Sequence, residues 1–89
     1  MSEDRSTAIE RGLTRGHSYA QEHADDRASL GRIARAHSAA AVEANVDAAV
    51  VESLDLDDPV AFWSGFAHGV GRFLLEEGVA HLDPTATEG

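Results

Sequence analysis

The sequence predicts an all-α fold, a compact bundle of three main helices. Apolar residues recur at alternating steps of three and four along most of the 89 residues, which is the spacing of one helix face. No stretch shows the alternation of apolar and polar residues that is typical of a half-buried strand. A chain of this length buries only about 60–65% of the surface that it exposes when unfolded. We therefore expect one helical domain over residues 1–89, with homodimerisation as an alternative way to complete its core.

The first main helix is expected over about residues 5–24. Thr7 and Glu10 fit a capping box near its start. Apolar or small residues follow one seam at steps of four and three: Ile9, Leu13, Gly16, Ala20 and His23. Only Ile9 and Leu13 are large and aliphatic, so the seam of this helix offers little apolar volume to a core.

The second main helix is expected over residues 26–54, with Asp25 or Asp26 as its N-cap. It has the most regular seam of the chain: Leu30, Ala34, His37, Ala41, Ala44, Ala48 and Val51. A sustained heptad seam predicts left-handed packing against another helix. Residues 45–47 mark a candidate break. The sequence leaves the continuity of the helix open both there and at residues 24–26.

The third main helix is expected over residues 58–78. Asp58 fits an N-cap, Pro59 fits the first helical position and Gly78 fits the residue after the last turn. Two adjacent seams run along it: Trp63, Ala67, Val70 and Leu74, and Phe62, Phe66, Gly69 and Phe73. Because this helix carries most of the bulky side chains, we expect it at the centre of the bundle. Residues 85–89 are expected to form a frayed tail.

Two pairs of glycines four residues apart predict tight helix crossings. The pairs are Gly12 with Gly16 and Gly65 with Gly69. Glycine has no Cβ, so a neighbouring helix can approach its backbone closely. The second pair lies in an apolar helix with no strand before it, which does not fit a phosphate-binding loop.

The aromatic side chains of the third helix are the leading candidates for a partner interface. They are Phe62, Trp63, Phe66 and Phe73. The first two helices carry few large apolar residues, so we expect part of this aromatic set to be exposed as an association surface. Aromatic residues dominate the energetics of interfaces. The expected partner is a second copy of the chain or another protein.

The composition indicates a protein of a salt-rich cytoplasm. The net charge is -9, the pI is about 4.7, and all seven basic residues are arginine. Many acids without lysine resemble the proteins of salt-in halophilic archaea, in which concentrated ions screen acidic self-repulsion. The N-terminus has no apolar signal segment, and the apolar run over residues 60–75 is interrupted by His68 and Arg72. We expect a cytoplasmic location and no membrane partner.

Four arginines form a second candidate site, for phosphate groups or an acidic partner: Arg11, Arg15, Arg32 and Arg35. Residues 1–36 carry six arginines and six acids, whereas residues 37–89 carry one arginine and ten acids. The alternative is that these arginines pair with Glu10, Glu22 and Asp25. Nucleic acid is the less favoured partner, because the chain is acidic overall and high salt weakens phosphate contacts. A nucleic-acid-associated or regulatory role is the second functional hypothesis.

Three histidines support a weaker hypothesis of a metal or haem site: His17, His37 and His68. No two of the five histidines have the three- or four-residue spacing of helical metal ligands. The absence of cysteine excludes disulfides and thiolate ligands. No serine lies in a nucleophile-elbow motif. We expect no cofactor, and the lack of a catalytic motif leans against an enzyme but leaves that question open. The leading hypothesis is a small cytosolic interaction or self-association module.

Overall fold

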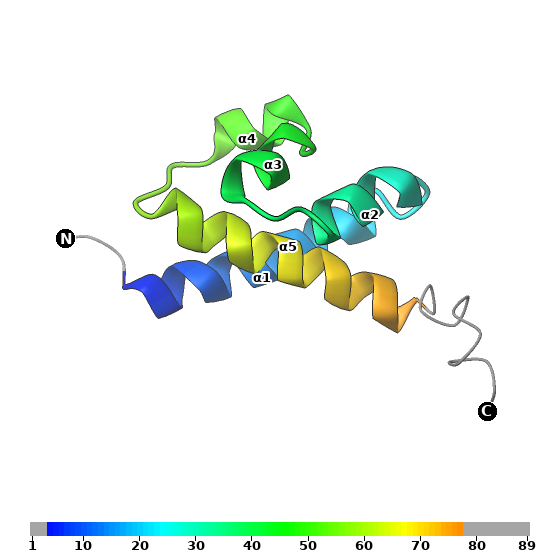
Figure 1. Ribbon diagram of the computed structural model, residues 1–89, viewed down its shortest axis with the longest axis horizontal. Helices are drawn as coiled ribbons and strands as arrows, with labels where there is room; N and C mark the ends of the chain where they lie inside the picture. The colour runs from blue at the N-terminus through cyan, green and yellow to red at the C-terminus, as the bar shows by residue number, and fades with distance from the viewer. Residues whose placement is uncertain (1–3, 78–89) are drawn as a thin grey trace.

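Five α-helices make up residues 4–77, the part of the chain that the computed structural model describes (Figure 1). In chain order they are α1 (Arg5–Glu22), α2 (Arg27–Ala34), α3 (Ala39–Ala44), α4 (Ala48–Ser53) and α5 (Pro59–Glu76). α1 and α5 lie side by side, and α5 also packs against α2 and α3. The predicted all-α bundle with the C-terminal helix at its centre is confirmed. Gly78 and the tail at 85–89 lie outside the described residues.

α1 and α5 run in the same direction and cross with their backbones in close contact. At Gly12 and Gly16 an added Cβ would lie under 3.0 Å from the backbone of α5. At Gly65 and Gly69 it would lie under 3.0 Å from the backbone of α1. Real Cβ atoms essentially never come so close, so the present spacing of the helices requires glycine at all four positions. The tight crossing predicted from the glycine spacing is confirmed.

The aromatic side chains of α5 form the core of the single chain. Phe66 is fully covered, and Phe62, Trp63 and Phe73 keep at most 5% of their surface exposed. Ring centroids lie 5.1 Å apart in the Phe62–Trp63 pair and in the Trp63–Phe66 pair. The expectation that part of this set is exposed was therefore wrong. The close crossing lets the backbone of α1 come against α5, so large side chains on α1 are not needed to complete the core.

Large side chains from other elements complete the same core cluster: Tyr19, Leu30, Ile33, Val42 and Val46. Leu30 and Ile33 of α2 are fully buried. Tyr19 of α1 packs on Phe66 with ring centroids 5.3 Å apart, and its hydroxyl accepts a hydrogen bond from the Asp47 N–H at 3.1 Å. This bond ties the start of α4 to α1 across 28 residues of sequence.

The middle of the chain forms three short helices in place of the one expected over residues 26–54. The break near residue 45 is confirmed, but a second break at residues 35–38 was not expected. Ser38 caps α3 by accepting from the Ala41 N–H, and Asp47 caps α4 by accepting from the Ala49 N–H. These caps satisfy backbone donors that a continuous helix would pair internally. The alanine-rich seam buries too little surface to hold one straight helix against α5.

The ends of the long helices follow the sequence at α5 but not at α1. Asp58 caps α5 by accepting from the Ala61 N–H at 3.2 Å, and Pro59 stands in the first turn as predicted. α1 starts at Arg5 with Asp4 as its N-cap, and the Asp4 side chain makes no capping bond. The capping box expected from Thr7 is therefore wrong, because that residue already lies inside the helix.

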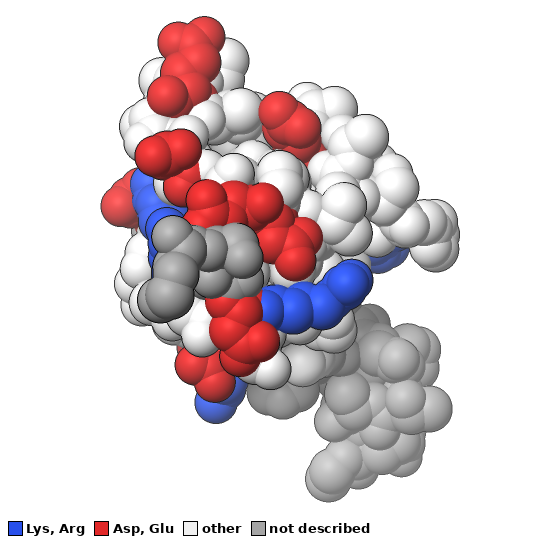
Figure 2. Space-filling view, turned by 90° about the vertical axis from the view of Figure 1, so that its left-hand side faces the viewer, with Lys and Arg blue, Asp and Glu red and all other residues white. Residues whose placement is uncertain are grey.

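The parallel arrangement places the N-termini of α1 and α5 at one end of the molecule. The N-terminus of a helix carries a partial positive charge, so two of them together favour acidic neighbours. Asp4 and Asp58 are the N-caps at this end. Figure 2 views the molecule from this end and shows acidic side chains gathered there.

Candidate functional site

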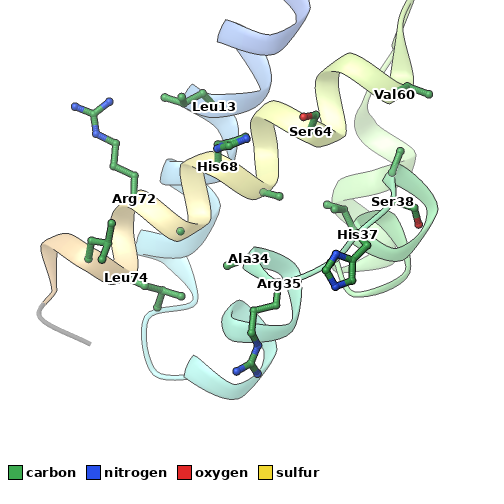
Figure 3. A pocket seen from close by; sticks show the side chains of 16 residues that line it. Leu13, Ala34, Arg35, His37, Ser38, Val60, Ser64, His68, Arg72 and Leu74 are labelled. Carbon is green, nitrogen blue, oxygen red and sulfur yellow. The ribbon is translucent and has the colours of Figure 1, made fainter. Parts of the chain in front are cut away.

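The main candidate site is a groove between α5 and residues 34–42, the segment that leads from α2 into α3 (Figure 3). Sixteen residues line it, and its volume is about 1040 Å³. Pockets for small molecules usually measure about 300–1,000 Å³ and enclose most of their ligand. This groove is comparably large but open to solvent. Its shape therefore suits an extended partner better than an enclosed small molecule. We call it the α5 groove.

Small side chains form the floor of the α5 groove. Ala67 and Gly71 stand one turn apart on α5, with Ala34 and Ala39 on the side of the α2–α3 segment. An added Cβ at Gly71 would lie 3.8 Å from the Ala34 Cβ, which is an ordinary contact distance. Gly71 thus differs from Gly69, two residues away, where an added Cβ would meet the α1 backbone. The floor has room for another chain to approach the backbone of α5.

Apolar side chains mark both ends of the α5 groove. Val60 is 58% exposed and Leu75 is 63% exposed, and in the described part of the chain these are the exposed large hydrophobic residues. They stand fifteen residues apart on α5, which corresponds to about 22 Å along a helix axis. Full burial of one such side chain stabilises a complex by about 1.5–3 kcal/mol. The groove therefore offers apolar surface over its whole length.

The charges along the α5 groove differ from those of the whole chain. The protein carries 16 acidic residues, yet no Asp or Glu among residues 4–77 lines this groove. Arg35 and His37 lie on the wall formed by the α2–α3 segment, and His68 and Arg72 lie on the wall formed by α5 (Figure 3). Arg72 also pairs with Glu76, just outside the groove, at 3.6 Å. An apolar floor with basic groups on both walls is the result.

None of the four aromatic anchors predicted from the sequence lines the α5 groove. Three of them lie wholly within the core, and Phe62 also reaches the lining of a second, smaller hollow beside α1. Their burial means that they hold the surface in place and do not form it. Among the residues that do form it, Arg35, His37 and His68 were singled out from the sequence for other roles, and its apolar and small residues were missed. The steps from Val60 to Ser64, Ala67, Gly71 and Leu75 keep one face of α5, which is the pattern that identifies this surface.

The three candidate metal ligands do not come together. His17 places its Nε2 atom 2.6 Å from the Glu76 Oε1 atom and stands edge-on to Phe73. His37 and His68 are exposed on the two walls of the α5 groove. Within residues 4–77, no group of three His, Asp or Glu side chains is placed to hold a metal ion.

The four candidate arginines do not form one surface. Arg11 and Arg15 line the hollow beside α1, and Arg15 approaches Glu22 at 4.0 Å. Arg32 donates to the Asn45 Oδ1 atom at 3.3 Å, which links α2 to the end of α3. Arg35 lies on a wall of the α5 groove. The structure thus divides the set among three environments, and only Arg35 belongs to the main candidate site.

No protein-family model, curated protein or solved structure matches this chain. Across residues 4–77, no helix has the length and apolar character needed to cross a membrane.

Proposed function

We propose that this chain is a small, non-enzymatic interaction module that binds a protein partner through the α5 groove. One observation carries the proposal. A chain with a net charge of -9 leaves an apolar groove open on its surface, with exposed apolar side chains at both ends and, in the described part of the chain, no acid in its lining. Exposed apolar surface of this kind marks association sites on soluble proteins.

The position of the groove also supports this proposal. Its α5 wall is the central helix, whose other face is fixed by the glycine crossing with α1. A rigid wall reduces the entropy that is lost when a partner binds. The core aromatic side chains hold that wall from behind, and this is the role that we now give to Phe62, Trp63, Phe66 and Phe73.

We further propose that the module works in the cytoplasm of a halophilic archaeon. The composition supports this setting: 16 acids, no lysine and seven arginines. Concentrated salt screens interactions between exposed charges at distances beyond about 3 Å. The burial of apolar surface does not depend on such charges. A partner site with an apolar floor therefore suits this setting better than a site built from phosphate contacts.

A comparison of co-purified proteins tests the proposed function. Tagged wild-type protein and the Gly71→Leu variant are each recovered from a halophilic host in multi-molar KCl, and the captured proteins are quantified by mass spectrometry. Leucine at this position projects into the groove and does not meet the α1 backbone. Circular dichroism must show equal helix content for the two baits.

We expect at least one protein to be recovered in near-stoichiometric amount with the wild type and to be lost with Gly71→Leu. Equal recovery with both baits, or recovery of no protein with either, contradicts the proposal. Recovery of nucleic acid by both baits favours the arginine-based alternative instead.

A further inference from the structure

We propose that the α5 groove receives an acidic amphipathic helix of a partner protein. This inference rests on the proposed function and deepens it, because it gives the occupant a shape and a charge. Three properties of the groove carry it: the absence of acids, the small residues along α5, and the length of the apolar strip.

Charge complementarity indicates that the partner segment is negatively charged. Acids outnumber arginines in this chain by 16 to 7, but the sixteen residues of the groove include two arginines, two histidines and no acid. An acidic segment can therefore approach the floor without meeting a carboxylate in the lining. Like charges placed opposite each other across an interface cost several kcal/mol, so this distribution discriminates between partners.

The small residues of α5 indicate that the partner segment is a helix. Gly65 and Gly69 on one face of α5 accept the backbone of α1. Ala67 and Gly71 have the same four-residue spacing on the groove face, where the end of α2 comes no closer to an added Cβ at Gly71 than the 3.8 Å of Ala34. A second helix can pack there in the same way, with its apolar face on the floor. The strip from Val60 to Leu75 matches a helix of about four turns.

The basic groups on the walls then meet the flanks of the bound helix. A guanidinium has five N–H donors, and a carboxylate can accept two of them side by side. Arg35 and Arg72 line opposite sides of the groove, and Figure 3 shows their guanidinium groups pointing away from each other, that of Arg35 back along α2. Both side chains are exposed, so a change of rotamer can turn each of them toward acids on the two flanks. The pair between Arg72 and Glu76 uses one Nε donor at 3.6 Å, so the remaining donors of this guanidinium can reach a partner.

The same charges argue against a second copy of the chain as the occupant. A two-fold dimer brings one surface patch against itself. Two α5 grooves facing each other would bring Arg35 and Arg72 of one copy near the same two arginines of the other copy. Such an interface would concentrate like charges around an apolar centre, which disfavours it.

Selection from a peptide library tests the inference directly. The library displays 18-residue helical peptides with apolar residues fixed along one face and random polar residues on the flanks. Selection on the wild-type protein in multi-molar KCl is paired with counter-selection on Gly71→Leu. We expect the enriched peptides to carry mostly Asp and Glu on both flanks.

Affinity measurements with the best peptide then test the two walls. Each exposed ion pair contributes about 0.2–1 kcal/mol, so at the lowest KCl concentration at which the protein stays folded the Arg35→Gln/Arg72→Gln double variant should bind about 2- to 30-fold more weakly. The difference from the wild type should shrink as KCl is raised, because salt screens exposed ion pairs. Val60→Glu, which adds an acid at an exposed end of the groove, should also weaken binding. This variant leaves the core untouched and remains a valid test even if Gly71→Leu fails to fold.

Three results would overturn the inference. Enrichment of neutral or basic flanks would exclude an acidic partner, although the proposed function would stand. A wild-type dimer in light scattering that becomes monomeric in Val60→Glu would identify a second copy as the occupant. Failure to enrich any peptide over the counter-selection would exclude a helical occupant. The co-purification experiment uses no peptide and judges the proposed function separately.

Discussion

Replacement of Gly69 by alanine is expected to separate α1 from α5. The nearest atom to the new Cβ would be the Leu13 carbonyl oxygen, followed by the His17 backbone nitrogen at 2.8 Å and the Leu13 carbonyl carbon at 2.9 Å, whereas ordinary contacts begin at 3.4 Å. All three neighbours are backbone atoms, so the helices must move apart by at least roughly 0.5–1 Å. A gap of that size already loses a quarter to a half of the van der Waals attraction along the crossing.

The magnitude follows from two opposing effects. Overpacking of a core typically costs about 1–3 kcal/mol, and backbone neighbours place this case at the upper end or above. Alanine gains about 1 kcal/mol over glycine in helix propensity. The expected net destabilisation is about 2 kcal/mol. This loss is a substantial part of the free energy of unfolding, which is about 4–13 kcal/mol for a chain of this length. In a domain of this size a loss of about 1 kcal/mol lowers the midpoint of thermal unfolding by about 4–8 °C, so the midpoint should fall by about 8–16 °C.

The matched control is the same substitution two residues further along α5. At Gly71 an added Cβ makes one ordinary contact, with the Ala34 Cβ at 3.8 Å. Gly71→Ala should therefore keep the gain in propensity and stabilise the protein by about 0.5–1 kcal/mol. Urea and thermal unfolding at constant KCl, followed by circular dichroism, measure both variants. Equal stability of Gly69→Ala and Gly71→Ala would refute the close crossing.

Three further substitutions test other parts of the structure in the same unfolding assay. Tyr19→Phe removes the hydroxyl that accepts from the Asp47 N–H and should cost about 1 kcal/mol; no loss would mean that this bond is not formed. Phe66→Asp places a charge at a fully buried position, so it should unfold the chain. A variant that stays folded but changes its assembly state would instead support the hypothesis that the aromatic side chains form an interface. Asp58→Ala removes the side-chain cap of α5 and should lower the free energy of unfolding by about 1 kcal/mol. Asp4→Ala should lower it by less, because the Asp4 side chain makes no capping bond to α1. A larger loss for Asp4→Ala than for Asp58→Ala would contradict the assigned caps.

The parts of the fold that the sequence predicts correctly are those decided by local chemistry. Asp26 and Asp58 each stand before a helix and accept a bond from its first turn, as the sequence indicates. The glycine pairs likewise predict the close crossing, because the absence of a Cβ has the same consequence in any context. The expected bounds of α1 and α5 lie within two residues of those in the structure, although the cap expected at the start of α1 was wrong.

The errors arise where tertiary packing decides. The seam from Leu30 to Val51 is regular in sequence, but most of its members are alanine and add little to burial. The chain therefore bends at residues 35–38, where Ser38 starts a new helix. The expectation that some aromatic side chains of α5 are exposed was wrong for a related reason. The amount of large apolar side chain on α1 does not reveal how closely its backbone approaches α5.

The candidate site could not be predicted, since it depends on the same bend. The α5 groove exists because residues 34–42 lie beside α5 without filling the space over Ala67 and Gly71. One continuous helix over this region would have given a different surface. Only the face of α5 that carries small residues between Val60 and Leu75 was visible in the sequence.

Site-specific photo-crosslinking in a halophilic host tests most directly whether the α5 groove holds a partner. A photoreactive amino acid replaces Ser64, which lies in the groove, and in a control strain replaces Thr14, which is exposed on α1 outside it. We expect one discrete crosslinked protein from the Ser64 position and none of that mass from the Thr14 position. The same adduct from both positions, or no adduct from Ser64, would contradict a partner site in this groove.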